Sequence, residues 1–276
     1  MGAAAAGPDV DDPPEPTRGR RGALVLFGDV ACPWATVMVL RVRAARAALG
    51  LDAGQLPLVH LAHPLELLYG HALSRRILDA EIPVCAAAAP TIDWSLWQGR
   101  LDEYPVSSLL AVEAVQAARH QSEVAAEELD LALRTALFAE SRCITLRREI
   151  LRTTSTCQHL DGDRLRADLD RGVARAAVMR QAAAAGWVAG QCTGHLVLPD
   201  ATGHCNPGVV TEWRGSPMPR GTPTVRADDA TVIERLVAKV AAAAEPAATR
   251  GRTDRRISSR RRAALQAQRG LRARNG

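Results

Sequence analysis

Lysine and aromatic residues are scarce in this chain of 276 residues. Lys239 is the only lysine, so arginine supplies nearly all of the basic charge. Aromatic side chains make up 3% of the residues, against 47% for hydrophobic residues as a whole, so a core has to be built mainly from alanine, valine and leucine. A chain of this length forms one large domain, or one domain that carries an insertion.

Long apolar runs are also missing. No stretch of about 18 uncharged apolar residues occurs, which predicts no membrane span and no membrane partner. The first residues do not combine a basic start with a continuous apolar segment, as a secretory signal does. We therefore expect a cytoplasmic protein whose cysteines are mostly thiols rather than disulfides. They are Cys32, Cys85, Cys143, Cys157, Cys192 and Cys205.

The net charge of +5 is unevenly distributed. Residues 245–276 hold ten arginines and two acidic residues, so the rest of the chain is mildly acidic. An arginine-rich tail can bind nucleic acid, but it is more often a solvated, disordered segment, so we expect no nucleic-acid partner beyond this tail. Residues 1–22, rich in proline, glycine and aspartate, are expected to form a second disordered tail. The sequence does not predict the oligomeric state.

A strand–helix–strand pattern follows the N-terminal tail. Residues 23–30 form a short apolar run that predicts a buried strand. A helix is predicted from about Pro33 to Leu49, because proline suits a first helical turn and Gly50 can stop the helix. Residues 56–67 read as a second buried strand. Such a βαβ unit implies that its two strands pair in parallel.

The middle of the chain has a helical pattern, and strand patterning returns only near residues 195–200. A turn-rich segment over residues 203–223 and a final helix over about 228–244 follow. These patterns predict an α/β fold with a small mixed sheet and a helical domain inserted after the second strand. The predicted parts are a discontinuous sheet domain (23–65 and 187–244), the helical insertion (66–186) and the two tails (1–22 and 245–276).

Cys32 stands where the predicted first strand gives way to the helix, in the stretch DVACPWA. Unpaired N–H groups and the helix dipole favour a thiolate at a helix N-terminus. The pKa of Cys32 is therefore expected below the free value of about 8.5, which would make Cys32 a nucleophile. The alternative is that Cys32 is a small hydrophobic residue that packs at the turn.

The stretch DVACPWA after an apolar strand resembles the active-site turn of DsbA-like proteins in the thioredoxin superfamily. The resemblance spans about residues 23–244 in order, through HPLELLY, LFAESRCITLRREIL, LVLPDATGHCNPG and WRGSPMPRGTPTVRADDATVIERLV. It is greatest to the intracellular branch that includes 2-hydroxychromene-2-carboxylate isomerases and kappa-class glutathione transferases. It implies a thioredoxin-like fold with a helical domain inserted after the second strand, and thiol-dependent chemistry at Cys32.

Two departures from that family bear on function. Its redox members carry Cys-x-x-Cys, whereas Ala35 replaces the second cysteine here, so a mixed disulfide on Cys32 has no neighbouring thiol to release the product. Relatives also have Gly-Ser-Pro or Gly-Thr-Pro before the third strand, with a cis proline that faces the cysteine. This chain reads VAGQCTGHLVLPD, without proline until Pro199. A cis bond without proline costs about 2.5–4 kcal/mol, so we expect a different, trans course for this loop.

The altered loop contains Cys192, at the point where the family's chain passes close to the active-site cysteine. We hypothesise that Cys192 is a displaced resolving cysteine that cycles with Cys32 between dithiol and disulfide. That pairing requires Cα atoms within roughly 7 Å of each other. The resemblance also marks four candidate substrate-binding residues: Pro33, Trp34, Thr193 and Gly194.

Two further groups of residues favour structural roles. Cys192, His195, His204 and Cys205 form a C-x2-H…H-C pattern with zinc-type ligands, but a predicted strand fills the 8-residue gap between the pairs, so no metal is expected. His60 and His63 differ by an odd number along the predicted second strand and therefore face opposite sides. Each is expected to be a buried, hydrogen-bonded histidine.

Three functions remain open at this point. The first is a monothiol oxidoreductase in which Cys32 forms a mixed disulfide with a small thiol or a substrate. The second is an isomerase or transferase that uses a small thiol, glutathione or an equivalent, as co-substrate. The third is a redox-inactive binding or scaffold protein. The first is preferred because Cys32 is a thiol, and no bound cofactor is expected.

Overall fold

The computed structural model describes residues 20, 22–72, 74–216 and 220–244. The chain divides into two compact units, Met1–Val240 and Ala241–Gly276, and only Ala241–Ala244 of the second unit are described. The predicted tails, residues 1–22 and 245–276, lie outside the described residues apart from Arg20 and Gly22.

The N-terminal βαβ unit forms as predicted. Strand β1 (Leu24–Gly28), helix α1 (Pro33–Ala48) and strand β2 (Leu58–Ala62) follow one another, and β1 pairs with β2 in parallel. Strand β2 is shorter than the predicted run of residues 56–67. Pro57 before it has no N–H to donate, and Pro64 after it is the N-cap of the next helix.

The central sheet has four strands in the order β2–β1–β3–β4. Strand β3 (His195–Val197) pairs with β1 in the antiparallel sense, and β4 (Gly203–Cys205) pairs with β3 in the same way. Strand β1 therefore lies between a neighbour from the start of the chain and one that follows the helical segment. This mixed sheet is the α/β core that the sequence predicts.

The segment after β3 contains strands where only turns were expected. Besides β4, it forms β5 (Val209–Arg214) and β6 (Thr222–Asp228), which make a separate two-stranded antiparallel sheet. Glycine and proline obscure these strands in the sequence. Pro223 lies within β6, where it is tolerated because each strand of a two-stranded sheet has one unpaired edge.

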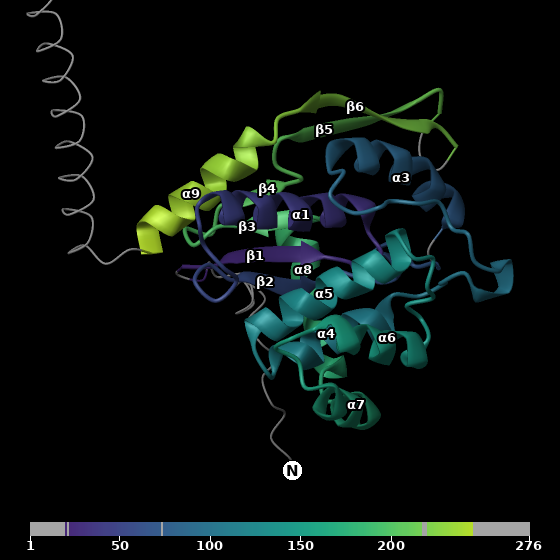
Figure 1. The fold of residues 1–276 in the computed structure, drawn as a ribbon. Coiled ribbons are helices and arrows are strands. Elements are labelled where there is room, and N and C mark those ends of the chain that lie inside the picture. The colour runs from purple at the N-terminus through teal and green to yellow at the C-terminus, as the bar shows by residue number, and fades with distance from the viewer. Residues whose placement is uncertain (1–19, 21, 73, 217–219, 245–276) are drawn as a thin grey trace, which may run out of the picture. The chain divides into compact units, whose positions relative to one another are not determined.

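Helices occupy the chain between β2 and β3, as Figure 1 shows. The helical character predicted for this segment is confirmed, while the boundaries of an inserted domain remain a prediction. The helices are α2 (Leu65–Tyr69), α3 (Arg75–Ala88), α4 (Leu109–Arg119), α5 (Glu123–Phe138), α6 (Arg147–Thr153), α7 (Gly162–Arg171) and α8 (Arg175–Val188), with the short 3-10 turns η2 (Leu101–Glu103) and η3 (Thr154–Thr156). Helix α9 (Thr231–Ala244) follows β6.

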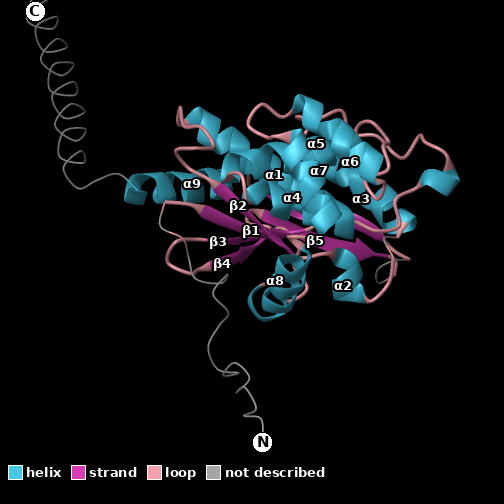
Figure 2. Ribbon diagram, turned by 90° about the horizontal axis from the view of Figure 1, so that it is seen from below, coloured by secondary structure: helices cyan, strands magenta, loops and turns pink. Residues whose placement is uncertain are grey.

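Both faces of the central sheet are covered by helices (Figure 2). Alternate side chains of a strand point to opposite faces, so β1 and β2 each supply two layers of packing. One layer packs against α8 and comprises Val25, Phe27, Val59 and Leu61 with Ala185 and Ala189. On the other face of β2, His60 Nδ1 lies 3.3 Å from Asp130 Oδ1 of α5. Burial of a side chain such as Phe27 contributes about 1.5–3 kcal/mol, so this packing holds the strand ends in place.

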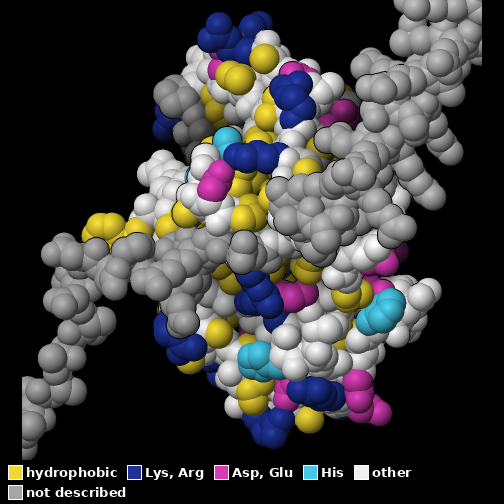
Figure 3. All heavy atoms as spheres, turned by 90° about the vertical axis from the view of Figure 1, so that its left-hand side faces the viewer, with side chains coloured by type: hydrophobic (Ala, Val, Ile, Leu, Met, Phe, Trp, Pro, Cys, Tyr) yellow, Lys and Arg dark blue, Asp and Glu magenta, His cyan; other side chains and the backbone are white. Residues whose placement is uncertain are grey.

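Among the described residues, no helix is both long and apolar enough to cross a membrane. On the face seen in Figure 3, the described arginine and lysine side chains lie among acidic, apolar and other side chains rather than in one continuous basic patch. The nucleic-acid partner considered for the arginine-rich tail concerns residues 245–276, which are outside the described part of the chain.

Candidate functional site

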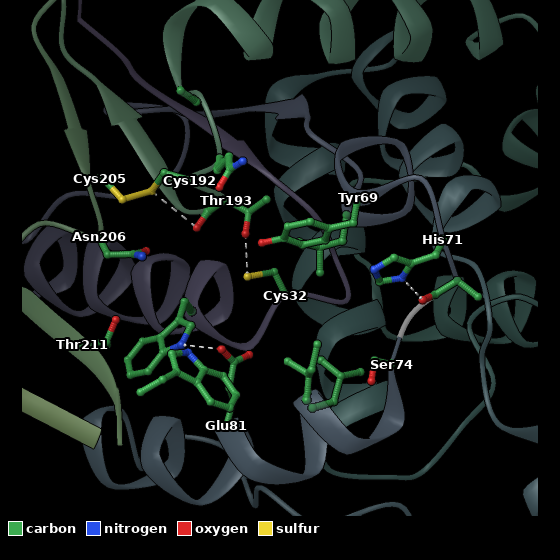
Figure 4. A pocket seen from close by; sticks show the side chains of 18 residues that line it. Cys32, Tyr69, His71, Ser74, Glu81, Cys192, Thr193, Cys205, Asn206 and Thr211 are labelled. Carbon is green, nitrogen blue, oxygen red and sulfur yellow. Dashed lines mark hydrogen bonds between the residues drawn. A yellow bond between two sulfur atoms is a disulfide. The ribbon is translucent and has the colours of Figure 1, made fainter. Parts of the chain in front are cut away.

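Cys32 is the N-cap residue of α1, at the end of the loop that leaves β1. Its backbone is extended, and its sulfur accepts a hydrogen bond from the Ala35 N–H at 3.4 Å. A second hydrogen bond comes from the Thr193 hydroxyl, whose oxygen lies 2.9 Å from the sulfur (Figure 4). Both donors favour a negative charge on the sulfur. The side chain is buried, with 4% of its surface exposed.

Burial dominates the titration of Cys32. Burial and, to a smaller extent, the nearby Glu81 carboxylate raise the pKa of the Cys32 thiol to about 11, against the opposing hydrogen bonds from Thr193 and Ala35. The lowered pKa expected from the helix N-terminus is therefore wrong in direction. The sequence shows that a helix begins at this cysteine, but it does not show how completely the fold removes the sulfur from water. At neutral pH Cys32 is a protonated thiol.

A pocket of about 490 Å³ opens in front of Cys32, and we call it the Cys32 pocket. Its wall combines residues of α1, the α2–α3 region, the loop before β3 and the second sheet. The lining includes Cys32, Trp34, Tyr69, Glu81, Cys192, Thr193, Cys205 and Asn206. A volume of this size suits a small-molecule ligand. Of the four predicted substrate-binding residues, Trp34 and Thr193 line the pocket, whereas Pro33 and Gly194 do not.

Glu81 is an acidic residue in this pocket that the sequence analysis did not single out. It lies on α3, and its Oε1 accepts a hydrogen bond from Trp34 Nε1 at 3.1 Å. Burial raises the pKa of Glu81 to about 7, although the Trp34 hydrogen bond opposes the rise. Its charge therefore changes near neutral pH. One glutamate among the apolar residues of α3 gave no sign in the sequence that it would face Cys32.

Cys192 does not pair with Cys32 in the structure. It forms a disulfide with Cys205, with Cα atoms 5.9 Å apart, whereas Cys32, Cys85, Cys143 and Cys157 are free. The hypothesis paired Cys192 with Cys32, whereas in the structure its partner is Cys205. The expectation that the cysteines are mostly thiols agrees with the four free ones, and Cys192 and Cys205 are the exceptions. The cause is tertiary: the β3–β4 ladder places His195 opposite Cys205, which brings Cys205 beside the loop that holds Cys192.

The disulfide also uses two of the four residues in the C-x2-H…H-C pattern. His195 is buried, and a Cβ added at Gly203 would lie 2.4 Å from its Nε2, so this histidine fills the space beside β4. Within the described ranges, no group of three or more His, Cys, Asp or Glu residues is arranged to hold a metal ion.

Gly194 explains why this loop has no proline before the third strand. Its φ angle is +92°, in the region that favours glycine, whereas proline is restricted to about −65°. Its N–H donates to the carbonyl oxygen of Phe27 at 3.0 Å, a hydrogen bond that proline cannot make. A Cβ at this position would lie 3.3 Å from the Cα of Ala35. Gly194 thus lets the loop approach α1 closely and brings Thr193 within reach of Cys32.

A buried arginine of α5 contacts the turn between β1 and α1, which carries Cys32. Arg134 donates to the carbonyl oxygen of Asp29 at 3.0 Å and to the hydroxyl of Thr36 at 2.9 Å. It is paired with Asp130, from Nε to Oδ2, at 2.7 Å. Burial alone would raise the pKa of Asp130, but Arg134 and His60 outweigh it and hold that pKa well below its usual range. These contacts fix the turn before α1.

The Asp29 carboxylate ties the same turn to two helices of the middle segment. It accepts hydrogen bonds from the N–H groups of Ala31, at 2.8 Å, and Leu65, at 2.7 Å. It also accepts one from the Ser108 hydroxyl at 2.8 Å. Asp29 therefore joins the turn to the starts of α2 and α4. No periodicity in the sequence marked Asp29 or Arg134 as partners, because they are brought together only by the packing of α5 against the sheet.

The two histidines of the second strand region do face opposite ways. His60 contacts Asp130 of α5, and His63 Nε2 lies 3.1 Å from the carbonyl oxygen of Gly190, beyond the end of α8. Both side chains are buried, as expected. His63 helps to hold the loop that carries Cys192 and Thr193.

Solved structures that superpose on the chain include proteins of the DsbA type. The chain has the thioredoxin-like fold of DsbA proteins. A probable DsbA oxidoreductase from Streptomyces coelicolor superposes with a TM-score of 0.53 at 18% identity, over 81% of this chain and 92% of that one. A putative protein disulfide isomerase from Nitrosomonas europaea superposes with a TM-score of 0.57 at 8% identity, over 80% of this chain and 97% of that one.

A third similar structure is the cytosolic disulfide reductase DsbM from Pseudomonas aeruginosa. It superposes with a TM-score of 0.51 at 12% identity, over 80% of this chain and 95% of that one. DsbM has also been solved with GSH, with the same TM-score of 0.51. No protein-family model and no curated protein sequence matches the chain. At these identities the similarity establishes the fold alone.

Proposed function

We propose that this protein is a thiol-dependent oxidoreductase that acts through Cys32 and forms a mixed disulfide there. The observation that carries the proposal is the pair of hydrogen bonds that the Cys32 sulfur accepts from Thr193 and Ala35. A sulfur used only for packing needs no such donors, whereas a thiolate that attacks and later leaves is stabilised by them in both steps. The adjacent Cys32 pocket provides room for the substrate.

The reaction begins when Cys32 loses its proton. The thiolate attacks one sulfur of a substrate disulfide R–S–S–R′, a bond forms between Cys32 and the R sulfur, and R′S⁻ leaves and takes up a proton. Since the pKa of Cys32 is raised to about 11, only a small fraction is thiolate at neutral pH. That thiolate is intrinsically a strong nucleophile, because nucleophilicity rises with thiol pKa. The rate is therefore expected to increase with pH.

A small thiol such as glutathione or an equivalent is the proposed co-substrate. The DsbM structure with GSH supports this choice, since that protein shares the fold. Trp34 supplies an apolar surface in the Cys32 pocket, and Asn206 supplies a polar one. A cytoplasmic location is proposed with it, by analogy with the cytosolic DsbM.

A second candidate is a small-thiol-dependent isomerase or transferase. The raised pKa of Cys32 favours it, because a thiol that stays protonated can contact a bound small thiol without forming a disulfide. In that case the sulfur of the co-substrate, not that of Cys32, carries out the chemistry. The test must therefore separate covalent from non-covalent binding.

The experiment incubates the protein as purified with oxidised glutathione at pH 7 to 9 and locates adducts by peptide mass spectrometry. We expect a glutathione adduct on Cys32 that grows with pH and is absent in Cys32→Ser. The matched control is Cys157→Ser, which removes a free, half-buried thiol outside the Cys32 pocket and should leave the adduct unchanged. Reduced glutathione that binds in calorimetry, without any Cys32 adduct, would support the isomerase or transferase instead. If reduced glutathione does not bind and no adduct forms on Cys32, the result would indicate a scaffold protein.

A further inference from the structure

The wall of the Cys32 pocket contains a disulfide as well as a thiol. Cys192 and Cys205 both line the pocket in which Cys32 lies. Cys192 is the residue before Thr193, whose hydroxyl donates to the Cys32 sulfur at 2.9 Å. In Figure 4 Thr193 lies between the disulfide and Cys32. Three sulfur atoms thus border one cavity, although Ala35 leaves α1 without the second cysteine of a Cys-x-x-Cys pair.

The disulfide is open to reagents. Cys205 is exposed and Cys192 is half-buried, whereas Cys32 is buried. Exposed disulfides are typically the labile, regulatory or catalytic ones, because small thiols can reach them. In the proposed cytoplasmic setting a disulfide is uncommon, and those that occur there are usually catalytic or redox-sensing.

The loop that carries Cys192 has anchors that do not depend on the disulfide. The Gly194 N–H donates to Phe27, and the Asn206 N–H donates to the carbonyl oxygen of Gly194 at 3.2 Å. The contact between His63 and Gly190 holds the other end of the loop. The β3–β4 ladder places His195 opposite Cys205. A reduced pair would therefore stay close enough for the disulfide to form again.

From this arrangement we infer that Cys192 and Cys205 are the resolving pair for Cys32, and that the disulfide seen in the structure is the oxidised end of a catalytic cycle. The inference rests on the proposed function of Cys32. Ala35 has no thiol that could release the substrate from its mixed disulfide with Cys32. The inference gives this step to Cys192 and Cys205, which come from a different part of the fold.

Substrate R–S–S–R′ reacts with the Cys32 thiolate to give the Cys32–R mixed disulfide and R′SH. The Cys192 thiolate attacks the Cys32 sulfur, and RS⁻ leaves and is protonated. The Cys205 thiolate then attacks the Cys192 sulfur and releases Cys32. The substrate gains two electrons, the Cys192–Cys205 dithiol loses two, and two molecules of a small thiol reduce the new disulfide, becoming a small-molecule disulfide themselves.

The test follows one turnover of the fully reduced, folded protein with oxidised glutathione, with acid quenching and mass spectrometry. In the wild-type protein we expect a short-lived adduct on Cys32, followed by the Cys192–Cys205 disulfide and two molecules of released glutathione. Cys192→Ser should prolong the Cys32 adduct by at least about tenfold, since its resolving thiol is missing. Cys205→Ser should instead accumulate a Cys32–Cys192 disulfide. Cys157→Ser serves as the matched control and should behave like the wild type.

The outcomes separate this inference from the proposed function. If the Cys32 adduct is as long-lived in the wild type as in Cys192→Ser, the disulfide is only structural and the inference is overturned, while the function of Cys32 stands. If no adduct forms on Cys32 in any variant, the proposed function itself fails. The wild-type protein provides a check that needs no variant: the native disulfide should be reduced by a glutathione buffer with no loss of circular dichroism signal. Reduction that occurs only on unfolding would overturn the inference.

Discussion

The sulfur of Cys32 is subject to two opposing influences. Burial and the Glu81 carboxylate raise the pKa of the thiol, and hydrogen bonds from Thr193 and Ala35 lower it. The balance leaves the thiol protonated at neutral pH, yet surrounded by the donors that a thiolate requires. Reactivity at this residue therefore depends on single hydrogen bonds and single charges, each of which can be removed.

Replacement of Thr193 by valine removes one donor and keeps the side-chain shape. We expect the pKa of Cys32 to rise further and its alkylation by iodoacetamide to slow by about tenfold at pH 8, since a hydrogen bond to a charged group contributes about 1.5–3 kcal/mol. Thr224→Val, on β6 and outside the Cys32 pocket, is the control. Equal rates for Thr193→Val and the wild type would show that this hydroxyl does not stabilise the thiolate.

At the scale of elements, helix α5 supports the site without reaching the pocket. Arg134 is the largest fully buried side chain of the described residues, and it connects α5 to the turn before α1 through Asp29 and Thr36. The Arg134 guanidinium is paired with Asp130, so removal of the guanidinium leaves the buried Asp130 carboxylate without this partner. The position of Cys32 thus depends on an ion pair in a helix about a hundred residues away in the sequence.

Arg134→Met is expected to lower the free energy of unfolding by about 3–5 kcal/mol, the usual cost of an unpaired buried charge. The double change Arg134→Met with Asp130→Asn should recover part of this loss, because both charges are then gone. Urea denaturation measures each value. Arg147→Met is the control, since its partner Asp170 is exposed and such pairs contribute about 0–1 kcal/mol. Similar losses at both arginines would contradict the role given to Arg134.

Elements differ in how well the sequence predicts them. Helix α1 and its two flanking strands were predicted because they are apolar and bounded by proline and glycine. Strands β4, β5 and β6 were not, since glycine and proline lie within or beside them and their pairing depends on partners elsewhere. The same glycines serve as turns, as at Gly208 and Gly215, where φ is positive.

At the scale of the whole molecule, Glu81 couples stability to pH. Its pKa is raised from 4.5 to about 7 in the folded protein, so between these values the folded state holds a proton that the unfolded state has released. Stability therefore falls as pH rises from about 4.5 to 7, by roughly 2–3 kcal/mol from this group. The free energy of unfolding of the whole protein is lowered, although the group responsible, Glu81, lies in the Cys32 pocket.

Glu81→Gln removes that cost and keeps an oxygen to accept the Trp34 hydrogen bond. We expect the variant to gain stability over the wild type at pH 8 but not at pH 4, as measured by urea denaturation across the range. Its Cys32 should also be alkylated faster at pH 8, because a negative charge near the sulfur is gone. Glu103→Gln, which changes an exposed carboxylate, is the control. A stability difference that does not vary with pH would show that Glu81 is not a raised-pKa acid.

The sequence by itself determined the α/β class, the βαβ start, the helical middle segment and the position of Cys32 at a helix N-terminus. These follow from local periodicity and from proline and glycine at helix ends, which act over a few residues. The resemblance to DsbA-like proteins added the thioredoxin-like fold, which the superposed structures share.

Only the tertiary structure decided the chemistry around Cys32. It buried the sulfur and so reversed the direction of its pKa shift, brought Glu81 from α3 to the same pocket, and paired Cys192 with Cys205 rather than with Cys32. The physical reason is that desolvation, charge and disulfide pairing depend on which residues are neighbours in space. Those neighbours come from segments far apart in the chain, and the packing of the helices and the β3–β4 ladder brings them together.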